Sequence, residues 1–193
     1  MVIRLKGWAK IVLSILCLVI FFFFVKIGID VYHSMMYPQK YAVLVEQYAD
    51  LYQVDQNLVY AVIKTESGFQ PNAVSENNAK GLMQITEDTF QWIGTKIGKK
   101  QTSQYVHDDM LRPEVNIMYG TYLLSYLLNE FHDYEVVLSA YHAGRTATNN
   151  WLSNQEYSSD GKTLEVIPYR DTNHYVDKVM RNYRKYQQLY LKK

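Results

Sequence analysis

The sequence predicts a mainly α-helical domain that follows a single N-terminal transmembrane helix. Two observations support this prediction. Residues 11–25 contain 14 apolar side chains in 15 positions, and no charged residue lies between Lys10 and Lys26. After Pro38, apolar residues recur at helical intervals nearly throughout, and no alternation of apolar and polar residues is long enough for a major sheet.

Residues 1–30 are expected to form a cytoplasmic stub and an uncleaved signal-anchor. The apolar run is shorter than the roughly 20 residues that usually span a bilayer, but apolar neighbours extend it and its flanking lysines can snorkel. A cleavable signal peptide is the alternative, yet no small-x-small cleavage site follows the run. Arg4, Lys6 and Lys10 place the N-terminus in the cytoplasm by the positive-inside rule. We therefore expect a single-pass protein of the cell membrane whose domain is extracytoplasmic.

Residues 31–40 are expected to form a juxtamembrane linker, and residues 41–193 a single domain. From Pro38 onward the chain has 193 − 37 = 156 residues, enough for one hydrophobic core and too few for two. N-cap residues, a first-turn proline and closing glycines bound the predicted helices. These helices are 41–52; one capped by Asp55 and closed by Gly68; one capped by Thr86 and ending at Gly98; Pro113–Phe131; Glu135–Tyr141, stopping near Gly144; and about Asp171–Leu189. Residues 154–163 are expected to form a polar loop or a small hairpin.

Composition excludes several kinds of site. Cys17 is the single cysteine, which excludes a disulfide framework and a thiolate metal cluster. The five histidines show no HExxH spacing, and the sequence has no GxSxG elbow, P-loop or GxGxxG motif. No metal and no cofactor are therefore expected. Residues 1–30 carry a net charge of +3, so the rest carries 1 − 3 = −2 and predicts no nucleic-acid partner.

Glu66 is the residue that remains as a candidate for chemistry. It lies in VYAVIKTESGF, on the last turn of a predicted apolar helix. There it faces the negative end of the helix dipole and an apolar wall, and both disfavour the ionised form. A raised pKa suits a general acid that must hold its proton near neutrality. From position alone, an ordinary solvated glutamate at a helix end remains the commoner alternative.

The surroundings of Glu66 carry a series of short motifs. They are Glu66-Ser67-Gly68-Phe69, Gly81-Leu82-Met83-Gln84-Ile85, Ala140-Tyr141-His142-Ala143-Gly144 and Ile167-Pro168-Tyr169-Arg170-Asp171-Thr172. In this order and at these intervals, about residues 41–186 resemble the catalytic domain of the soluble lytic transglycosylases, a branch of the lysozyme-like superfamily. The resemblance implies a lysozyme-like fold, of the type shared by goose-type lysozymes and lytic transglycosylases, and makes residues 41–193 the catalytic domain.

The resemblance also implies roles for individual residues. Glu66 matches the single catalytic acid and base, and Ser75 a residue near the reacting sugar. Met83 and Gln84 match the segment that lines the glycan groove. Tyr141 matches an aromatic residue whose hydroxyl approaches the catalytic carboxyl.

Two positions depart from the family pattern. His142 stands where the motif has Asn, and we interpret it as a polar substitute in the same wall rather than a second acid. Asp171 stands where the family usually has Glu; we expect a hydrogen-bonding role in the groove, with simple N-capping of the last helix as the alternative. Tyr169 is a further candidate for the groove wall.

The resemblance implies an enzyme that acts on the glycan strands of peptidoglycan. Glu66 would cleave the β-1,4 bond between N-acetylmuramic acid and N-acetylglucosamine and leave 1,6-anhydromuramoyl ends. Two alternatives stay open, a lysozyme-type hydrolase on the same fold and a catalytically idle wall-binding module. The expected partners are the glycan strands and, through the N-terminal helix, the membrane; the sequence identifies no protein partner.

Overall fold

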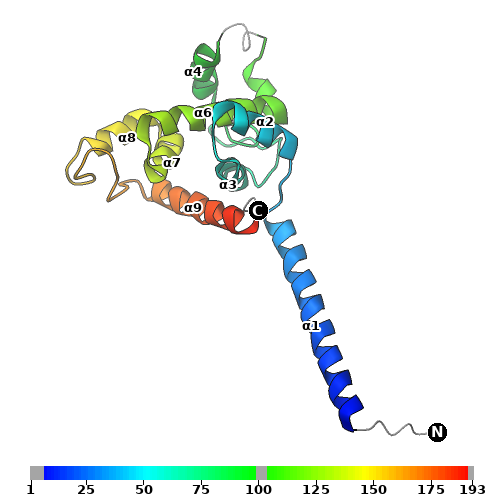
Figure 1. The fold of residues 1–193 in the computed structure, drawn as a ribbon. Coiled ribbons are helices and arrows are strands. Elements are labelled where there is room, and N and C mark those ends of the chain that lie inside the picture. The colour runs from blue at the N-terminus through cyan, green and yellow to red at the C-terminus, as the bar shows by residue number, and fades with distance from the viewer. Residues whose placement is uncertain (1–6, 99–103, 191–193) are drawn as a thin grey trace. The chain divides into compact units, whose positions relative to one another are not determined.

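The computed structural model describes residues 7–98 and 104–190. The chain divides into two compact units, residues 1–39 and residues 40–193 (Figure 1). The boundaries expected for the stub, the linker and the catalytic domain stay predictions.

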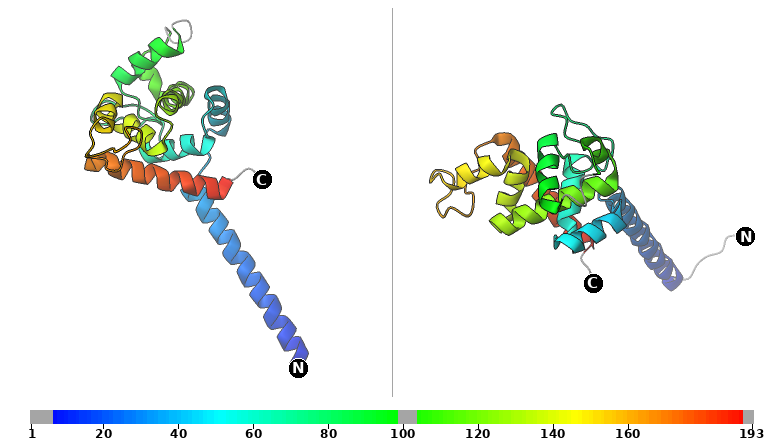
Figure 2. Two further views of the ribbon diagram at one scale, coloured as in Figure 1. Left: turned by 60° about the vertical axis from the view of Figure 1, so that its left-hand side comes forward. Right: turned by 90° about the horizontal axis from the view of Figure 1, so that it is seen from above.

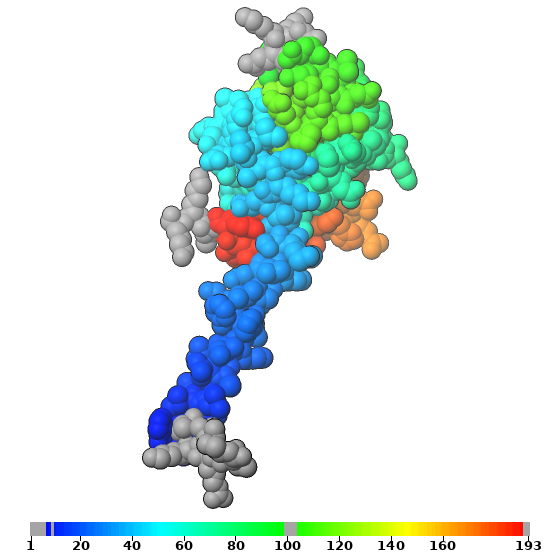
Figure 3. Space-filling view, turned by 90° about the vertical axis from the view of Figure 1, so that its right-hand side faces the viewer, coloured from blue at the N-terminus to red at the C-terminus, as the bar shows by residue number. Residues whose placement is uncertain are grey.

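The first unit contains one long helix, α1, which spans Gly7–Met36. Its large apolar side chains are exposed along its length (Figure 3). The stretch Lys10–Met36 is long and apolar enough to cross a membrane, and a window of 18 residues within it has a mean hydropathy of 2.8; a signal sequence near an N-terminus has the same properties. The helix continues through most of the segment expected to be a linker. It ends before Pro38, because a proline disfavours helical backbone at the residue that precedes it.

The second unit is built from helices, as the sequence predicts. They are α2 (Ala42–Tyr52), α3 (Gln56–Glu66), α4 (Glu87–Ile97), the short 3-10 helix η1 (His107–Leu111), α6 (Pro113–Phe131), α7 (Tyr134–Ala143), α8 (Arg145–Leu152) and α9 (Arg170–Tyr190). Within the described ranges, β structure is limited to isolated bridges that join Lys80 to Val74 and to Ile85. The mainly α-helical class is therefore confirmed.

The predicted helix starts lie where local sequence placed them, whereas α3 ends at Glu66 with Ser67 as its C-cap, one residue before the expected Gly68. Asp55 precedes α3 and accepts a hydrogen bond from the backbone N–H of Asn57 at 2.8 Å, and Thr86 caps α4. Pro113 opens α6. Two elements were not predicted, η1 and α8. η1 has only five residues, and α8 reads RTATNNWL, so neither shows a clear apolar period.

Helix α3 forms the centre of the second unit. Six consecutive residues, from Leu58 to Ile63, are buried, so the helix is enclosed on all sides. It packs most extensively against α9, which also contacts α7, and Figures 1 and 2 show α9 running along these two helices. The enclosed helix ends at Glu66, which brings this carboxylate out of the core at a defined point.

Candidate active site

Glu66 is the last residue of α3, and the residue as a whole is half-buried. The hydroxyl of Tyr175, on α9, donates a hydrogen bond to its Oε1 atom at 2.8 Å. Burial raises the pKa of Glu66 from 4.5 to about 7, and this effect outweighs the hydrogen bond from Tyr175 and the charge of Lys178, which both lower it. The side chain can therefore hold a proton near neutral pH, as expected of a general acid.

The hydrogen-bond partner of Glu66 is a residue for which the sequence predicts no role. Tyr175 lies 109 positions away in the chain and is itself buried. It occurs in the apolar stripe of a long helix, where a tyrosine resembles any other core residue. Burial raises its pKa, and the Glu66 carboxylate raises it further, so the hydroxyl keeps its proton and acts as the donor.

A buried asparagine fixes the segment 80–85 beside this site. Asn116 is fully buried on α6. Its Oδ1 accepts a hydrogen bond from the backbone N–H of Met83 at 2.7 Å. Its Nδ2 donates to the carbonyls of Lys80 and Met110, each at 2.8 Å. Ser67, the residue after Glu66, donates its hydroxyl to the carbonyl of Leu82 at 2.8 Å. The end of α3 and the segment 80–85 are thus held together.

Met83 does not lie on an open surface. Its side chain is fully buried, and a Cβ added to Gly120 on α6 would lie 2.3 Å from its Sδ, so only glycine allows this close approach. The chain turns this side chain into the core, and the part of Met83 in lining the glycan groove stays a prediction. Gln84 adopts a positive φ of 49°, and its Nε2 donates to the carbonyl of Gly81 at 2.8 Å. Its amide thus stabilises the turn.

Tyr141, on α7, donates its hydroxyl to the backbone carbonyl of Met83 at 2.7 Å. The hydroxyl that bonds to Glu66 is that of Tyr175, and the expected approach of the Tyr141 hydroxyl to the same carboxyl stays a prediction. Tyr141 still lies close enough to be influenced by the Glu66 charge, which adds to the effect of burial in raising the Tyr141 pKa. Tyr141 therefore links the acid to the segment 80–85.

His142 packs against the partner of the acid. Its ring stacks on Tyr175, with 4.5 Å between the ring centroids, and its Nδ1 lies 3.1 Å from the hydroxyl oxygen of Thr172. Partial burial lowers the pKa of His142, and the charge of Asp171 opposes this effect. The ring is thus mainly neutral at pH 7, which agrees with a polar wall residue better than with a second acid.

A shallow hollow of about 530 Å³ brings together three of the predicted residues, namely His142, Tyr169 and Asp171. Tyr169 is 58% exposed, and its ring lies edge-on to Trp151 at 5.0 Å between centroids. Asp171 is exposed in the first turn of α9. Ser75 is exposed on a loop, where its Oγ accepts a hydrogen bond from the backbone N–H of Ala79 at 3.0 Å. The roles expected of these residues stay predictions.

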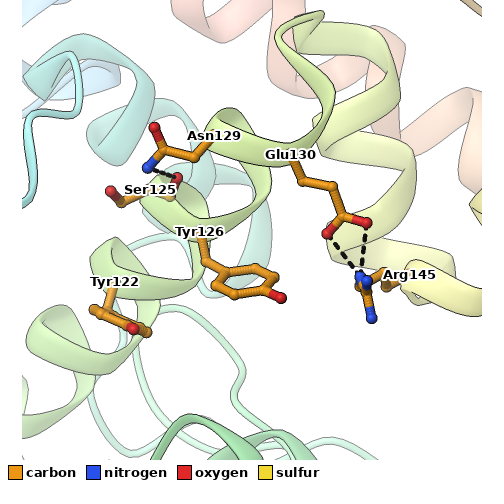
Figure 4. Close-up of a pocket in the computed structure, with 6 residues that line it drawn as sticks. All are labelled: Tyr122, Ser125, Tyr126, Asn129, Glu130 and Arg145. Carbon is orange, nitrogen blue, oxygen red and sulfur yellow. Dashed lines mark hydrogen bonds and ion pairs between the residues drawn. The ribbon is translucent and has the colours of Figure 1, made fainter. Parts of the chain in front are cut away.

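Two further hollows lie on the side of Tyr141. One, of about 230 Å³, is lined by Trp92 of α4, Leu123 and Leu127 of α6, and Tyr141. The other, of about 420 Å³, lies over one face of α6 and is drawn in Figure 4. The two neighbours of the Glu66–Tyr175 pair thus line different hollows, His142 one and Tyr141 another. An aromatic ring such as Trp92 can stack on a sugar and leave polar atoms free for hydrogen bonds.

Metal chemistry finds no support in the part of the chain that is described. No group of three or more His, Cys, Asp or Glu side chains there could hold a metal ion. The absence of a metal and of a cofactor stays a prediction.

Comparison with known sequences gives a consistent result. Residues 43–164 match the family described as Transglycosylase SLT domain. The soluble lytic murein transglycosylase of Escherichia coli K12 is 30% identical over 146 residues, which is 75% of this chain and 22% of that protein. The membrane-bound lytic murein transglycosylase C of Yersinia pestis (strain Pestoides F) is 37% identical over 108 residues, 56% of this chain and 30% of that protein. The chain thus spans less than a third of either relative.

Solved structures show the same fold. The 70 kDa soluble lytic transglycosylase of Escherichia coli superimposes with a TM-score of 0.70 at 24% identity, covering 81% of this chain and 25% of that one. An inactive Glu-to-Gln mutant of the lytic transglycosylase Slt of Pseudomonas aeruginosa gives 0.69 at 23% identity, covering 80% and 25%. The complex of the 70 kDa enzyme with bulgecin A gives 0.73 at 24% identity, covering 83% and 26%. The lysozyme-like fold expected from the sequence is confirmed.

Proposed function

Because the chain belongs to the transglycosylase SLT domain family, we propose that it is a peptidoglycan lytic transglycosylase in which Glu66 is the single general acid and base. The observation that carries this proposal is the Glu66 carboxylate, which the Tyr175 hydroxyl holds in place and which burial keeps protonated up to about pH 7. The relatives named above are lytic murein transglycosylases, and one of the solved structures is an inactive Glu-to-Gln mutant.

In the first step Glu66 donates its proton to the oxygen of the bond between N-acetylmuramic acid and N-acetylglucosamine. The bond from this oxygen to the muramoyl C1 breaks, and the N-acetylglucosamine leaves with a new hydroxyl. The oxygen of the muramoyl 2-acetamido group stabilises the positive charge that develops at C1. Since Tyr175 bonds to Oε1 of Glu66, the other carboxyl oxygen remains for the glycosidic oxygen.

In the second step the Glu66 carboxylate takes the proton from the muramoyl 6-hydroxyl. This oxygen then bonds to C1, which closes a 1,6-anhydro ring without consuming water and returns the proton to Glu66. Glycosidases that use a second carboxylate place it about 5–10 Å from the first. The proposed reaction needs no second carboxylate, because the 2-acetamido oxygen stabilises the charge at C1.

The proposal includes the place where the enzyme acts. α1 would anchor the chain in the cell membrane in a single pass, with its N-terminus in the cytoplasm and the catalytic domain outside. Protease added to intact cells should then remove the catalytic domain, and a carbonate wash should leave the anchor in the membrane fraction. Release of the whole chain by the wash, or protection of the domain from the protease, would contradict this topology.

A digest tests the reaction. Residues 38–193 contain the whole second unit with its own core, so this fragment can be purified and incubated with peptidoglycan. Transglycosylation predicts fragments that are lighter by one water than hydrolysed ones, and Glu66→Gln should abolish their release. Full-mass reducing ends would instead show the lysozyme-type alternative. Binding without release would show an idle wall-binding module.

A further inference from the structure

A pocket beside the proposed glycan site presents polar groups that the proposed reaction does not use (Figure 4). Its residues come from successive turns of one face of α6 and from the first residue of α8. They are Tyr122, Ser125, Tyr126, Asn129, Glu130 and Arg145. The pocket measures about 420 Å³, so it can hold part of an amino acid or peptide.

The Arg145 side chain is held by one edge only. Its Nε donates to both carboxylate oxygens of Glu130, at 2.7 and 2.6 Å, and Figure 4 shows both contacts at the same edge of the guanidinium. A guanidinium has five N–H donors, and no residue in the described ranges accepts from its terminal amino groups. The side chain remains 52% exposed. Glu130 thus orients a guanidinium whose terminal donors are available to a ligand.

The floor of the pocket is fixed by hydrogen bonds to the backbone. Ser125 donates its hydroxyl to the carbonyl of Tyr52 at 2.7 Å, and Asn129 donates its amide to the carbonyl of Ser125 at 2.9 Å. The hydroxyls of Tyr122 and Tyr126 find no hydrogen-bond partner among the described side chains, and the Tyr126 hydroxyl points towards Arg145 in Figure 4. Free N–H and O–H donors around an oriented guanidinium match the oxygens of a carboxylate.

The pocket adjoins the hollow that contains Tyr141. Arg145 lines both, and Trp92 of that hollow lies edge-on to Tyr126 with 4.9 Å between ring centroids. A ligand that extends sideways from a strand bound near Tyr141 would therefore reach Arg145. In peptidoglycan the groups that extend sideways from the glycan strand are the peptides on the lactyl groups of N-acetylmuramic acid. The carboxylates of these peptides are negatively charged, whereas the sugar rings are uncharged.

We propose that Arg145, oriented by Glu130 and assisted by Tyr122 and Tyr126, binds a free carboxylate of the peptide on a neighbouring muramoyl residue. This inference rests on the proposed function and adds that the enzyme selects strands that carry acidic peptides. The lactyl group is a second source of carboxylate, since it is free once the peptide has been removed, and the test separates the two.

The test compares three kinds of glycan strand with the 38–193 fragment. The strands carry peptides with free carboxylates, the same peptides with amidated carboxylates, or no peptide and therefore free lactyl carboxylates. The wild-type protein should prefer the first kind by about tenfold in kcat/KM, through a lower KM, which is the size expected for one charge-assisted pair. Arg145→Gln should lose this preference. Arg145→Lys should keep part of it, because a lysine has the positive charge but lacks the paired N–H donors of a guanidinium.

Arg112→Gln is a matched control. Arg112 pairs with Asp109 at 3.3 Å and is 56% exposed, close to the 52% of Arg145, but it lies at the opposite end of α6. It should keep the wild-type preference. Any of three results would overturn the inference. Arg145→Gln could lose activity equally on all three kinds of strand, or the wild type could show no preference among them. The third result is a wild-type preference for peptide-free strands over strands with amidated peptides, if Arg145→Gln abolishes that preference. If the wild type cleaves none of the strands, the proposed function fails. The equilibrium binding of the three kinds of strand to the wild type and to the same variants then still tests the role of Arg145.

Discussion

Replacing Glu66 by Gln should stabilise the protein at alkaline pH and leave its stability unchanged at acidic pH. The folded protein raises the pKa of Glu66 from 4.5 to about 7, mainly through burial. Folding therefore favours the neutral carboxyl. The favourable contribution is complete below pH 4.5 and is lost as the pH rises to about 7, where the folded protein must bury a charge. Gln carries no charge at any pH and keeps an oxygen that can accept the Tyr175 hydrogen bond.

The size of the effect follows from the same pKa. The rise of 7 − 4.5 = 2.5 pKa units corresponds to at most about 3 kcal/mol at 1.36 kcal/mol per unit. For a domain of this size, 1 kcal/mol changes the melting temperature by about 2–4 °C, so the difference at pH 8 should reach roughly 6–12 °C. At pH 4.5 the two proteins should melt together.

Thermal unfolding of the 38–193 fragment between pH 4.5 and 8 measures this difference. Glu156→Gln is the control, because Glu156 is exposed and its replacement should leave the pH dependence of melting unchanged. Melting curves of Glu66→Gln that stay parallel to those of the wild type at every pH would refute the reasoning. Glu66 would then have an ordinary pKa and could not serve as an acid held neutral by its surroundings.

Three further results are expected. Cleavage of peptidoglycan should decline as the pH rises through about 7, since Glu66 then loses the proton that the leaving group needs; a pH–rate profile flat to pH 9 would contradict this. Tyr175→Phe removes a hydrogen bond that lowers the Glu66 pKa, so the alkaline limb of that profile should move to higher pH and the rate should fall by about tenfold; an unmoved limb would count against the pairing. Asn116→Leu leaves the buried Met83 N–H and Met110 carbonyl without their side-chain partner and removes one of the two hydrogen bonds to the Lys80 carbonyl, so it should lower the free energy of unfolding by about 2–4 kcal/mol, measured in urea. A change below about 1 kcal/mol would mean that water replaces the amide.

The helices that the sequence predicted well are those with strong local signals. Asp55, Thr86 and Pro113 define helix starts through their own side chains, so their neighbours suffice to place them. Helix α8 has no such signal in its interior; what stabilises it is Trp151 and Leu152, buried against Val136 and Leu164. Contacts of this kind are not visible in a local pattern.

The candidate site divides in the same way. The position of Glu66 at the end of an apolar helix predicted a raised pKa, and the structure supports this through burial. The partner of Glu66 could not be predicted, because Tyr175 is distant in sequence and has the same helical spacing as the core tyrosines. The buried side chain of Met83 was also missed, since only the packing of α6 shows that Gly120 makes room for it.

The short connection between α1 and α2 limits where the proposed enzyme could cut. Only five residues, 37–41, separate the end of α1 at Met36 from the start of α2 at Ala42. Fully extended, they span roughly 20 Å, the end of α1 after the apolar stretch adds about 10 Å and the catalytic domain about 40 Å, so its active site would stay within about 70 Å of a bilayer that holds α1. The enzyme would thus trim only the innermost layer of the wall, and each molecule would work on the patch above its own anchor.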